Sequence, residues 1–469
     1  MSPVLFLIVH LLSRPAPTGH QGQLSAEFAL QRRRIAAACE PKPSSLMTCP
    51  IELFTDHPVH VAAGSLAPQN GFAFGPAFVT HRVSDARDLS LNADAVRSPG
   101  GSWRAGVYFK AVLTPVAETV VVPIDPGAAE PPAGLAIHPY PIVDGYVQTT
   151  SLRTVFFYGL GPDTTKEDRA AFATHQTVAG ARVTYPLFRG RVFKALKLAA
   201  MAEVNGRWVD VNDPDVSGNV PPVSARHTEL TAPGLSSQPG FAQFGEGVRI
   251  RPALASDRLR FNYAFSLAQF VAVSDSQYSF HRWTANLDQE WSLYRTVLAA
   301  ASRDTHGPDD CSATLGSSPC PQPSVSRNRY GSIGFQVYAS AASAGSSGSV
   351  PFYFQQTLGG SDIDGNRRLS AYEDYRFTGP KLFLMRESLE HYIYGIVGLS
   401  LTAEQGTVAA PGAALKLTQL KHSTAAGISV RAGGLPVAYL TWATGPEGHR
   451  FIATVNASLL GGSSRPSLK

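Results

Sequence analysis

Charged residues and long uninterrupted apolar runs are both scarce in this 469-residue chain. Asp, Glu, Lys and Arg make up 16% of it, against roughly 25% in ordinary soluble domains. After the N-terminal segment there is no uninterrupted apolar stretch of about 18 residues, which excludes membrane-spanning α-helices. Apolar residues nevertheless account for 44% of the chain. This combination is typical of strands that are apolar on one face only, as in a membrane β-barrel.

Sequence motifs for catalysis and cofactor binding are also missing. The chain contains no G-x-S-x-G elbow, no P-loop, no H-E-x-x-H and no dinucleotide fingerprint. The net charge is +5, but the Lys and Arg residues are scattered, and no basic run lies beside interleaved aromatic residues. Nucleic-acid binding therefore has little support. The sequence predicts a protein that is not an enzyme and carries no cofactor.

The four cysteines form two close pairs, Cys39 with Cys49 and Cys311 with Cys320. Neither pair has C-x-x-C spacing or nearby histidine ligands, so a zinc site is not expected and no other metal site is predicted. Two short disulfide-closed loops fit the spacing better and would require an oxidising compartment. Free thiols in a cytosolic protein are the alternative.

The N-terminal region divides into two predicted parts. The apolar run from Val4 to Leu12 indicates a signal peptide within residues 1–20, although a basic start and a small-residue cleavage site are missing. An ordinary buried segment is the alternative. Residues 21–70 are rich in proline and lack clear periodicity, so we interpret them as an irregular N-terminal arm.

From residue 71 onward, segments of alternating apolar and polar residues are separated by Gly, Pro, Asp and Ser. In residues 89–96, for example, Leu89 and Leu91 share one face and Asn92 and Asp94 share the other. Residues 103–113, 258–268 and 282–291 alternate in the same way, which is the signature of a strand with two different faces.

Alternation alone fits a soluble β-sandwich as well as a membrane barrel, so segment length decides between them. The segments are about 10–15 residues long, whereas sandwich strands usually run about 5–6 and tilted transmembrane strands about 9–11. Trp103, Trp208 and Trp291 lie near segment ends, as in an interfacial aromatic girdle. The sequence therefore predicts an all-β fold, a transmembrane antiparallel barrel of about sixteen strands over residues 71–469.

Residues 352–460 carry motifs of a known barrel. Residues 352–360 read FYFQQTLGG, and Leu369 and Tyr372 match two positions of a following Leu-Arg-Gly-Tyr/Phe motif. This part of the chain resembles the barrel of the BamA/TamA, or bacterial surface antigen, outer-membrane family. In that family the motif loop folds back into the lumen, where its arginine meets acidic residues of neighbouring strands. The resemblance implies the following lumen or loop-motif residues: Leu369, Ser370, Tyr372, Arg376, Glu390 and Glu404.

The chain departs from the family pattern at several of these positions. Ser370 and Ala371 stand where the motif has Arg and Gly, Glu404 replaces an aspartate, and the family's Glu-Tyr-Arg reads as residues 388–390, Ser-Leu-Glu. The resemblance implies an outer-membrane protein, expected to be a monomer in contact with lipid. It also implies a role in outer-membrane biogenesis or protein insertion, with client outer-membrane proteins or assembly machinery as partners. The missing arginine predicts an altered loop clasp.

Three other interpretations remain open. A passive pore or uptake channel could use the same barrel, and a soluble secreted all-β binding protein could also alternate its residues in this way. The third concerns residues 362–373, which have the oxygen spacing of an EF-hand calcium loop. Because Arg367 stands where such a loop needs glycine, and because the flanks read as strands, a polar barrel loop with a turn at Asp364 and Gly365 is favoured.

Overall fold

The computed structural model describes residues 58–84, 87–113, 140–187, 196–214, 220–252, 259–295, 330–394, 397–432, 435–455 and 465–469. Within them, sixteen strands form one antiparallel sheet in which each strand pairs with the next strand of the sheet order. The predicted all-β fold and the count of about sixteen strands are confirmed. No helix of the described residues is long and apolar enough to cross a membrane.

The strands of the large sheet are, in order, β1(Val59–Ser65), β2(Phe72–Ser84), β3(Arg87–Arg97), β4(Trp103–Leu113), β5(Ile142–Phe157), β6(Ala170–Leu187), β7(Leu198–Asn212), β8(Phe241–Ile250), β9(Leu259–Ala272), β10(Phe280–Arg295), β11(Tyr330–Ala344), β14(Lys381–Tyr394), β15(Val397–Ala409), β16(Lys421–Ala432), β17(Leu435–Gly445) and β18(Gly448–Val455). A small second sheet pairs β12(Gln356–Leu358) with β13(Phe377–Gly379). The described parts of the connections contain the short helices η1(Lys166–Asp168), α5(Val223–Arg226), η2(Ser276–Tyr278) and η3(Phe352–Phe354).

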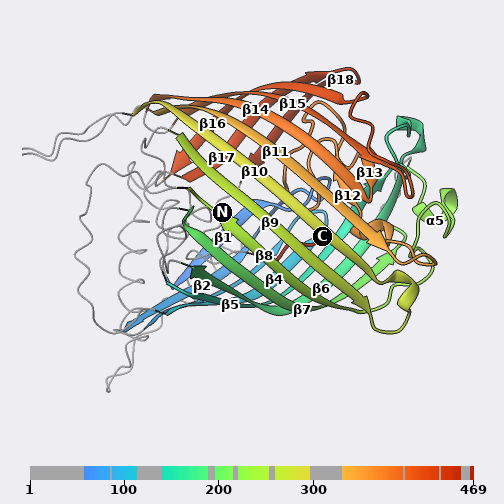
Figure 1. The fold of residues 1–469 in the computed structure, drawn as a ribbon, viewed down its shortest axis with the longest axis horizontal. Helices are drawn as coiled ribbons and strands as arrows, with labels where there is room; N and C mark the ends of the chain where they lie inside the picture. Colours follow the sequence, from blue (N-terminus) through green and yellow to red (C-terminus); the bar gives the residue numbers. More distant parts are fainter. Residues whose placement is uncertain are drawn as a thin grey trace, which may run out of the picture.

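The sheet curls into a nearly closed barrel with strongly tilted strands (Figure 1). The first and last strands, β1 and β18, come into contact, and the backbone N–H of Val455 donates a hydrogen bond to Ser65 Oγ at 3.3 Å. Among the described residues, the first strand of the barrel starts at Val59, inside the segment that we interpret from sequence as an irregular arm. Strand β1 is only seven residues long and contains Gly64, which explains why its alternation is hard to recognise.

On strands β3 and β4, the pattern of buried and exposed side chains is the reverse of that in a soluble β-sandwich. On β3, the polar residues Asn92 and Asp94 are 1% and 4% exposed, whereas Leu91 between Ser90 and Asn92 is 39% exposed. On β4, Tyr108 is 1% exposed while its neighbours Val107 and Phe109 point outward. Soluble proteins bury apolar residues and leave polar ones at the surface. A barrel whose outer face meets lipid does the opposite, because only its lumen offers polar partners.

The tryptophans of the predicted girdle differ in their surroundings. Trp208 on β7 and Trp291 on β10 lie on the outer face and are 55% and 56% exposed. Trp103, the first residue of β4, is partly covered, with its ring centroid 5.7 Å from that of His175. An interfacial girdle remains a prediction, since it depends on where a bilayer surrounds the barrel.

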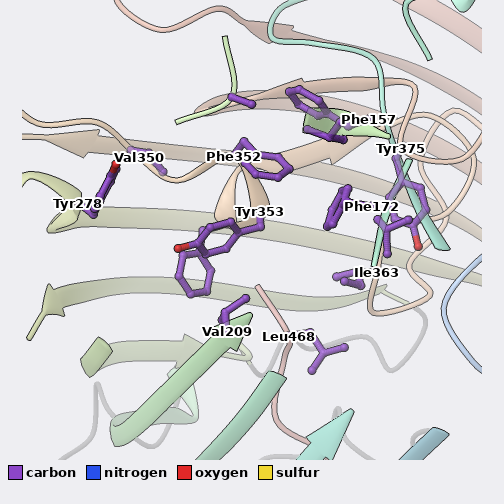
Figure 2. Close-up of a cluster of buried hydrophobic side chains, with 14 of the residues drawn as sticks. Phe157, Phe172, Val209, Tyr278, Val350, Phe352, Tyr353, Ile363, Tyr375 and Leu468 are labelled. Atoms are coloured by element: carbon purple, nitrogen blue, oxygen red, sulfur yellow. The ribbon is translucent and has the colours of Figure 1, made fainter. Parts of the chain in front are cut away.

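The largest apolar cluster lies inside the barrel. Because neighbouring strands alternate in direction, the connections 66–71, 158–169, 220–240, 345–380 and 446–447 all lie at the same end. The cluster joins inward-facing residues of β5 to β11 with residues of the 345–380 connection (Figure 2). This connection therefore enters the lumen, and it organises the candidate site.

Candidate functional site

The candidate site is the lumen loop, which we define as residues 345–380, between β11 and β14. Its backbone turns sharply after β12. Gly359 and Gly360 have φ angles of +112° and +58°, and a Cβ at Gly359 would lie 2.5 Å from the Cβ of Arg376. Only glycine adopts such a conformation without strain. The Leu-Gly-Gly sequence therefore allows β12 to turn back and pair with β13, which forms the base of the loop.

The first half of the lumen loop is held by aromatic side chains. Phe352 and Phe354 of η3 are 2% and 0% exposed. The ring of Phe352 lies 5.1 Å from that of Phe172 on β6, and the ring of Phe354 lies 5.0 Å from that of Phe241 on β8. Each such pair contributes about 0.5–1.5 kcal/mol beyond area burial. This half of the loop therefore packs against the inner face of β5–β10.

The second half of the loop is held by charged and polar groups, with Glu404 of β15 at the centre. Glu404 is 2% exposed. Its carboxylate accepts hydrogen bonds from the backbone N–H of Ser370 at 2.7 Å and from Arg386 Nε and Nη2 of β14 at 2.9 and 2.7 Å. Charge-assisted hydrogen bonds of this kind are roughly twice as strong as neutral ones. Glu404 therefore fastens the loop to the barrel wall.

The guanidinium at Glu404 does not come from the sequence position of the motif arginine. The loop residue at the arginine position, Ser370, contributes its backbone N–H, and the guanidinium comes from Arg386 on the wall. Arg386 also donates to the backbone carbonyl of Arg367, so the same side chain holds the carboxylate and the loop. Glu404 and Arg386 thus form a buried carboxylate–guanidinium pair, although the arginine lies on β14 and not in the lumen loop.

Further contacts tie the loop to the last three strands. Arg367 donates to Thr441 Oγ1 of β17 at 2.7 Å and to Thr454 Oγ1 of β18 at 2.9 Å. The backbone N–H of Ala371 donates to Ser423 Oγ of β16 at 2.9 Å. The polar half of the loop therefore contacts β15, β16, β17 and β18 in turn.

Asp374 links both sides of the junction between β1 and β18. Its carboxylate accepts a hydrogen bond from Arg450 Nη2 of β18 at 2.9 Å. It also accepts one from Gln69 Nε2, in the turn that follows β1, at 3.1 Å, and one from the backbone N–H of Ser361 at 2.9 Å. One loop carboxylate thus connects the first and the last part of the barrel.

Arg376, 3% exposed, makes a second link of this kind. It forms an ion pair with Glu447, in the turn between β17 and β18, at 2.9 Å. It also donates to the side-chain and backbone oxygens of Thr164, between β5 and β6, at 2.9 and 2.7 Å. Arg376 therefore joins the β17–β18 end to the β5–β6 connection through the loop.

Of the six residues implied by the resemblance, the structure brings five together in this site. Leu369 is fully buried, and burial raises the pKa of Tyr372, whose ring lies 5.3 Å from that of Phe377. Glu390 lies apart from them. It is an exposed residue of β14, opposite Ser332 and Ser400 in the strand register, four positions beyond the Arg386 that meets Glu404. Sequence reasoning missed Arg386. The alternation of β14 places this residue on the polar face, but alternation alone does not show that Glu404 is its partner.

The calcium-loop spacing of residues 362–373 serves internal contacts. Asp362 accepts hydrogen bonds from the backbone N–H groups of Asp364 and Asn366 at 3.0 and 2.8 Å and forms an ion pair with Arg368 at 3.3 Å. Gly365 has a φ of +83°, as the favoured turn requires. The described residues contain no group of three or more His, Cys, Asp or Glu that could hold a metal ion.

The predicted disulfides, Cys39 with Cys49 and Cys311 with Cys320, lie outside the described residues, as do residues 1–20 of the predicted signal peptide. They stay predictions. The same holds for most of the segment interpreted as an irregular arm, of which the structure describes only residues 58–70.

These features define the class: a sixteen-stranded antiparallel β-barrel with an apolar outer face and a loop fastened inside its lumen. No protein-family model matches the sequence, and no curated protein sequence matches it. Among solved structures, the chain is similar to CdiB from Acinetobacter baumannii (10% identity, TM-score 0.44, 84% of this chain and 58% of that chain). It is also similar to CdiB from Escherichia coli (11%, TM-score 0.49, 86% and 63%).

A third similar structure is BamA from Haemophilus ducreyi lacking POTRA domains 1–3 (10% identity, TM-score 0.45, 84% of this chain and 68% of that chain). BamA belongs to the family that residues 352–460 resemble. The chain spans less than two thirds of the length of either CdiB chain. Its function is therefore argued from its own residues.

Proposed function

We propose that this chain is a bacterial outer-membrane β-barrel that inserts or translocates polypeptides by rearranging the lumen loop and the junction between β1 and β18. The observation that carries the proposal is the position of Asp374, whose carboxylate holds Arg450 of β18 and Gln69 beyond β1 at once. Because the loop contacts both sides of one strand junction, a movement of the loop in the lumen would also change the junction in the barrel wall.

The membrane location is supported by the outer face. Large apolar residues are exposed all around the barrel, on β3, β4, β9, β15 and β17 among others, for example Leu91, Val107, Leu267, Leu401 and Leu440. In water such a surface would be an aggregation hazard, whereas in lipid it needs no partner. Closed barrels also satisfy the backbone hydrogen bonds that a bilayer cannot.

The polypeptide substrate is supported by the chemistry of a strand junction. The edge of a strand presents backbone N–H and C=O groups that can pair with an incoming extended segment. A junction that opens therefore offers a template for a client strand, and the loop contacts of Asp374 and Arg376 are placed to control it. The resemblance of residues 352–460 to the surface antigen family supports the same role.

The test is a disulfide across the junction. Ser65→Cys with Val455→Cys would join β1 to β18, in a chain whose four native cysteines are replaced by serine. The matched control, Ala285→Cys with Ala339→Cys, joins β10 to β11 at directly opposite positions of the ladder. Both variants are reconstituted in lipid vesicles, and the assembly of a small client barrel is followed by its resistance to SDS before boiling.

We expect the junction disulfide to block client assembly, reduction to restore it, and the control disulfide to leave it unchanged. Full activity of the oxidised junction variant would refute the proposal. A passive pore is the second candidate, and the aromatic half of the lumen loop argues against it because it occupies part of the lumen, packed against the inner face of β5–β10. Steady ion conductance through the unmodified protein in planar bilayers would favour the pore.

A further inference from the structure

A five-residue segment with the sequence Arg-Pro-Ser-Leu-Lys, residues 465–469, lies inside the barrel. Its contacts are made with inward-facing groups of β3 and with the lumen loop. The segment therefore occupies space in the lumen that the sixteen strands and the lumen loop leave between them.

The segment is anchored at its first residue by a buried carboxylate. Arg465 Nη2 lies 2.7 Å from Asp94 Oδ2 of β3, and the Asp94 side chain has no exposed surface. Arg104 of β4 meets the same oxygen at 3.1 Å, so Asp94 keeps a cationic partner when Arg465 is absent. This arrangement binds an arginine without making the barrel wall depend on it.

The middle of the segment is held by Asp364 of the lumen loop. Asp364 Oδ2 accepts a hydrogen bond from Ser467 Oγ at 2.6 Å, and Oδ1 accepts one from the backbone N–H of Leu468 at 2.7 Å. One carboxylate thus contacts a side chain and the backbone of consecutive residues. The turn that presents Asp364 is held separately by Asp362, whose contacts lie within the loop.

The last two residues enter two different environments. Leu468 is 8% exposed and belongs to the aromatic cluster, near Ile363 of the lumen loop (Figure 2). Lys469 Nζ donates to the backbone carbonyl of Gln355 at 2.8 Å and to Thr357 Oγ1 at 3.3 Å. A cavity of about 410 Å³ lies directly beside Ser467 and Lys469, so the segment borders open lumen.

We propose that β3 and the lumen loop form a binding site for a short peptide segment with the pattern Arg-x-Ser-apolar-Lys, which residues 465–469 occupy as a removable plug. Each of four positions meets a group of matching chemistry: a carboxylate for the guanidinium, a second carboxylate for the hydroxyl and backbone N–H, an apolar wall for leucine, and oxygens for the ammonium. A segment of that pattern in another polypeptide would compete for the same groups.

The short length of the segment makes the occupation reversible. Five residues with three polar anchor points cannot bind tightly on their own, but a tethered segment is present at an effective concentration in the millimolar range. The site is therefore filled in the resting protein and can be vacated by a competitor. The inference does not rest on the proposed function, because peptide binding and conductance are measured without a client assembly assay.

The experiment uses the full chain in detergent with Leu468→Asp, which places a charge in the aromatic cluster and unseats the segment. Leu417→Asp, at an exposed leucine between β15 and β16, is the matched control. The probe is a fluorescent peptide with the sequence of residues 465–469, blocked at both ends, and the control peptide carries Asp in place of Leu. Heat modifiability on cold SDS gels establishes that each variant is folded.

We expect Leu468→Asp to bind the probe at least about tenfold more tightly than the wild type or Leu417→Asp, because the tethered segment no longer competes. The control peptide should not bind. Adding Asp364→Ala to Leu468→Asp should abolish binding of the probe. In planar bilayers, Leu468→Asp should raise conductance, and the probe should lower it again.

A second variant protects the test against misfolding of the first. Arg465→Glu places a carboxylate beside Asp94 and unseats the segment by like-charge repulsion without entering the aromatic cluster. If both variants fold, fail to bind the probe and conduct like the wild type, the segment is a fixed part of the wall and the proposal is overturned. Higher conductance without probe binding would equally overturn the peptide site.

Discussion

The lumen loop has two halves that are held in the barrel by different forces. Residues 350–363 face β5–β10 and are held by buried aromatic and aliphatic side chains, with Phe352 and Phe354 at the centre. Residues 367–376 contact β14–β18 mainly through carboxylates and guanidiniums, with Glu404 and Asp374 as the chief acceptors. Leu369 and Tyr372 of this half also pack in a smaller buried apolar cluster with residues of β14 and β15. One loop thus combines an apolar attachment with an ionic one.

The difference indicates which half can move. Apolar contacts are non-directional and are lost gradually with area, so they tolerate small shifts. Ionic hydrogen bonds depend on geometry, and breaking one partner of a buried pair leaves the other charge unpaired. The ionic half lies at the junction of β1 and β18, where the proposed function requires a change. We therefore infer that the apolar half is the fixed side of the loop and the ionic half is the switching side.

The largest effect is expected when the fixed side is broken. Phe354→Ala removes a fully buried ring between Phe241, Phe270 and Phe280. Such truncations cost about 3–5 kcal/mol, which should appear as a lower urea midpoint for loss of the heat-modifiable band. Phe451→Ala, at an exposed aromatic position of β18, is the control and should change the midpoint little. A small loss for Phe354→Ala would show that the apolar half does not fix the loop.

On the switching side, Glu404→Ala removes the central carboxylate and leaves Arg386 without an anionic partner. We expect a loss of roughly 3 kcal/mol, at the low end for a broken buried pair, because Arg386 retains 25% of its side-chain exposure. The variant should still fold but should show fluctuating conductance, since the loop tip is released. Unchanged folding, surface display and conductance would contradict a role for Glu404 in the lumen.

A smaller effect is expected for Asp374→Asn, which keeps a side-chain oxygen but loses the charge that holds Arg450. The stability loss should be about 1–2 kcal/mol. Client assembly should nevertheless change more in Asp374→Asn than in Phe354→Ala when the two proteins are compared under conditions of equal stability, because Asp374 acts at the junction. Thr284→Ala on β10, whose hydroxyl contacts Ser340 in the lumen, is the polar control away from the junction. Equal effects of Asp374→Asn and Thr284→Ala on client assembly would contradict the distinction between the two halves of the loop.

The smallest effect concerns pH. Burial acts to raise the pKa of Glu229, but hydrogen bonds from Ser236, Tyr278 and Gly234 outweigh it, so the pKa lies below the ordinary 4.5. A carboxylate with a lowered folded-state pKa stabilises the fold above its unfolded pKa and loses that contribution as the pH falls through the folded value. Glu229 lies in the connection whose Pro233 carbonyl accepts the N–H of Phe352 at 2.8 Å, on the fixed side.

We therefore expect the wild type to be more stable than Glu229→Gln at pH 7, and the difference to shrink as the pH falls below about 4.5. The measurement is the urea midpoint of both proteins between pH 3 and 7. A difference that stays constant over this range would show that the charge of Glu229 does not support the loop.

Sequence patterns were sufficient for the barrel. Alternation with a period of two places Leu91 and Asp94 on opposite faces whatever the partners are, and strand lengths beyond those of a sandwich indicate a membrane-spanning sheet. The structure places Leu369, Ser370, Tyr372 and Arg376 together in the lumen loop, and their functional role stays a prediction. Glu390 shows the limit of this reasoning, because a matching position in a motif does not give the distance between two points along a strand.

What the sequence determined by itself is therefore the periodic part of this protein: an all-β fold, about sixteen strands, and which face of each strand is apolar. Those properties follow from local geometry, since successive side chains of a strand must point to opposite sides. Only the tertiary structure decided that Arg386 pairs with Glu404, that Asp374 joins β1 to β18, and that residues 465–469 enter the lumen. These pairs are separated by between 18 and 371 positions, and no local pattern encodes which distant partners a closed barrel brings together.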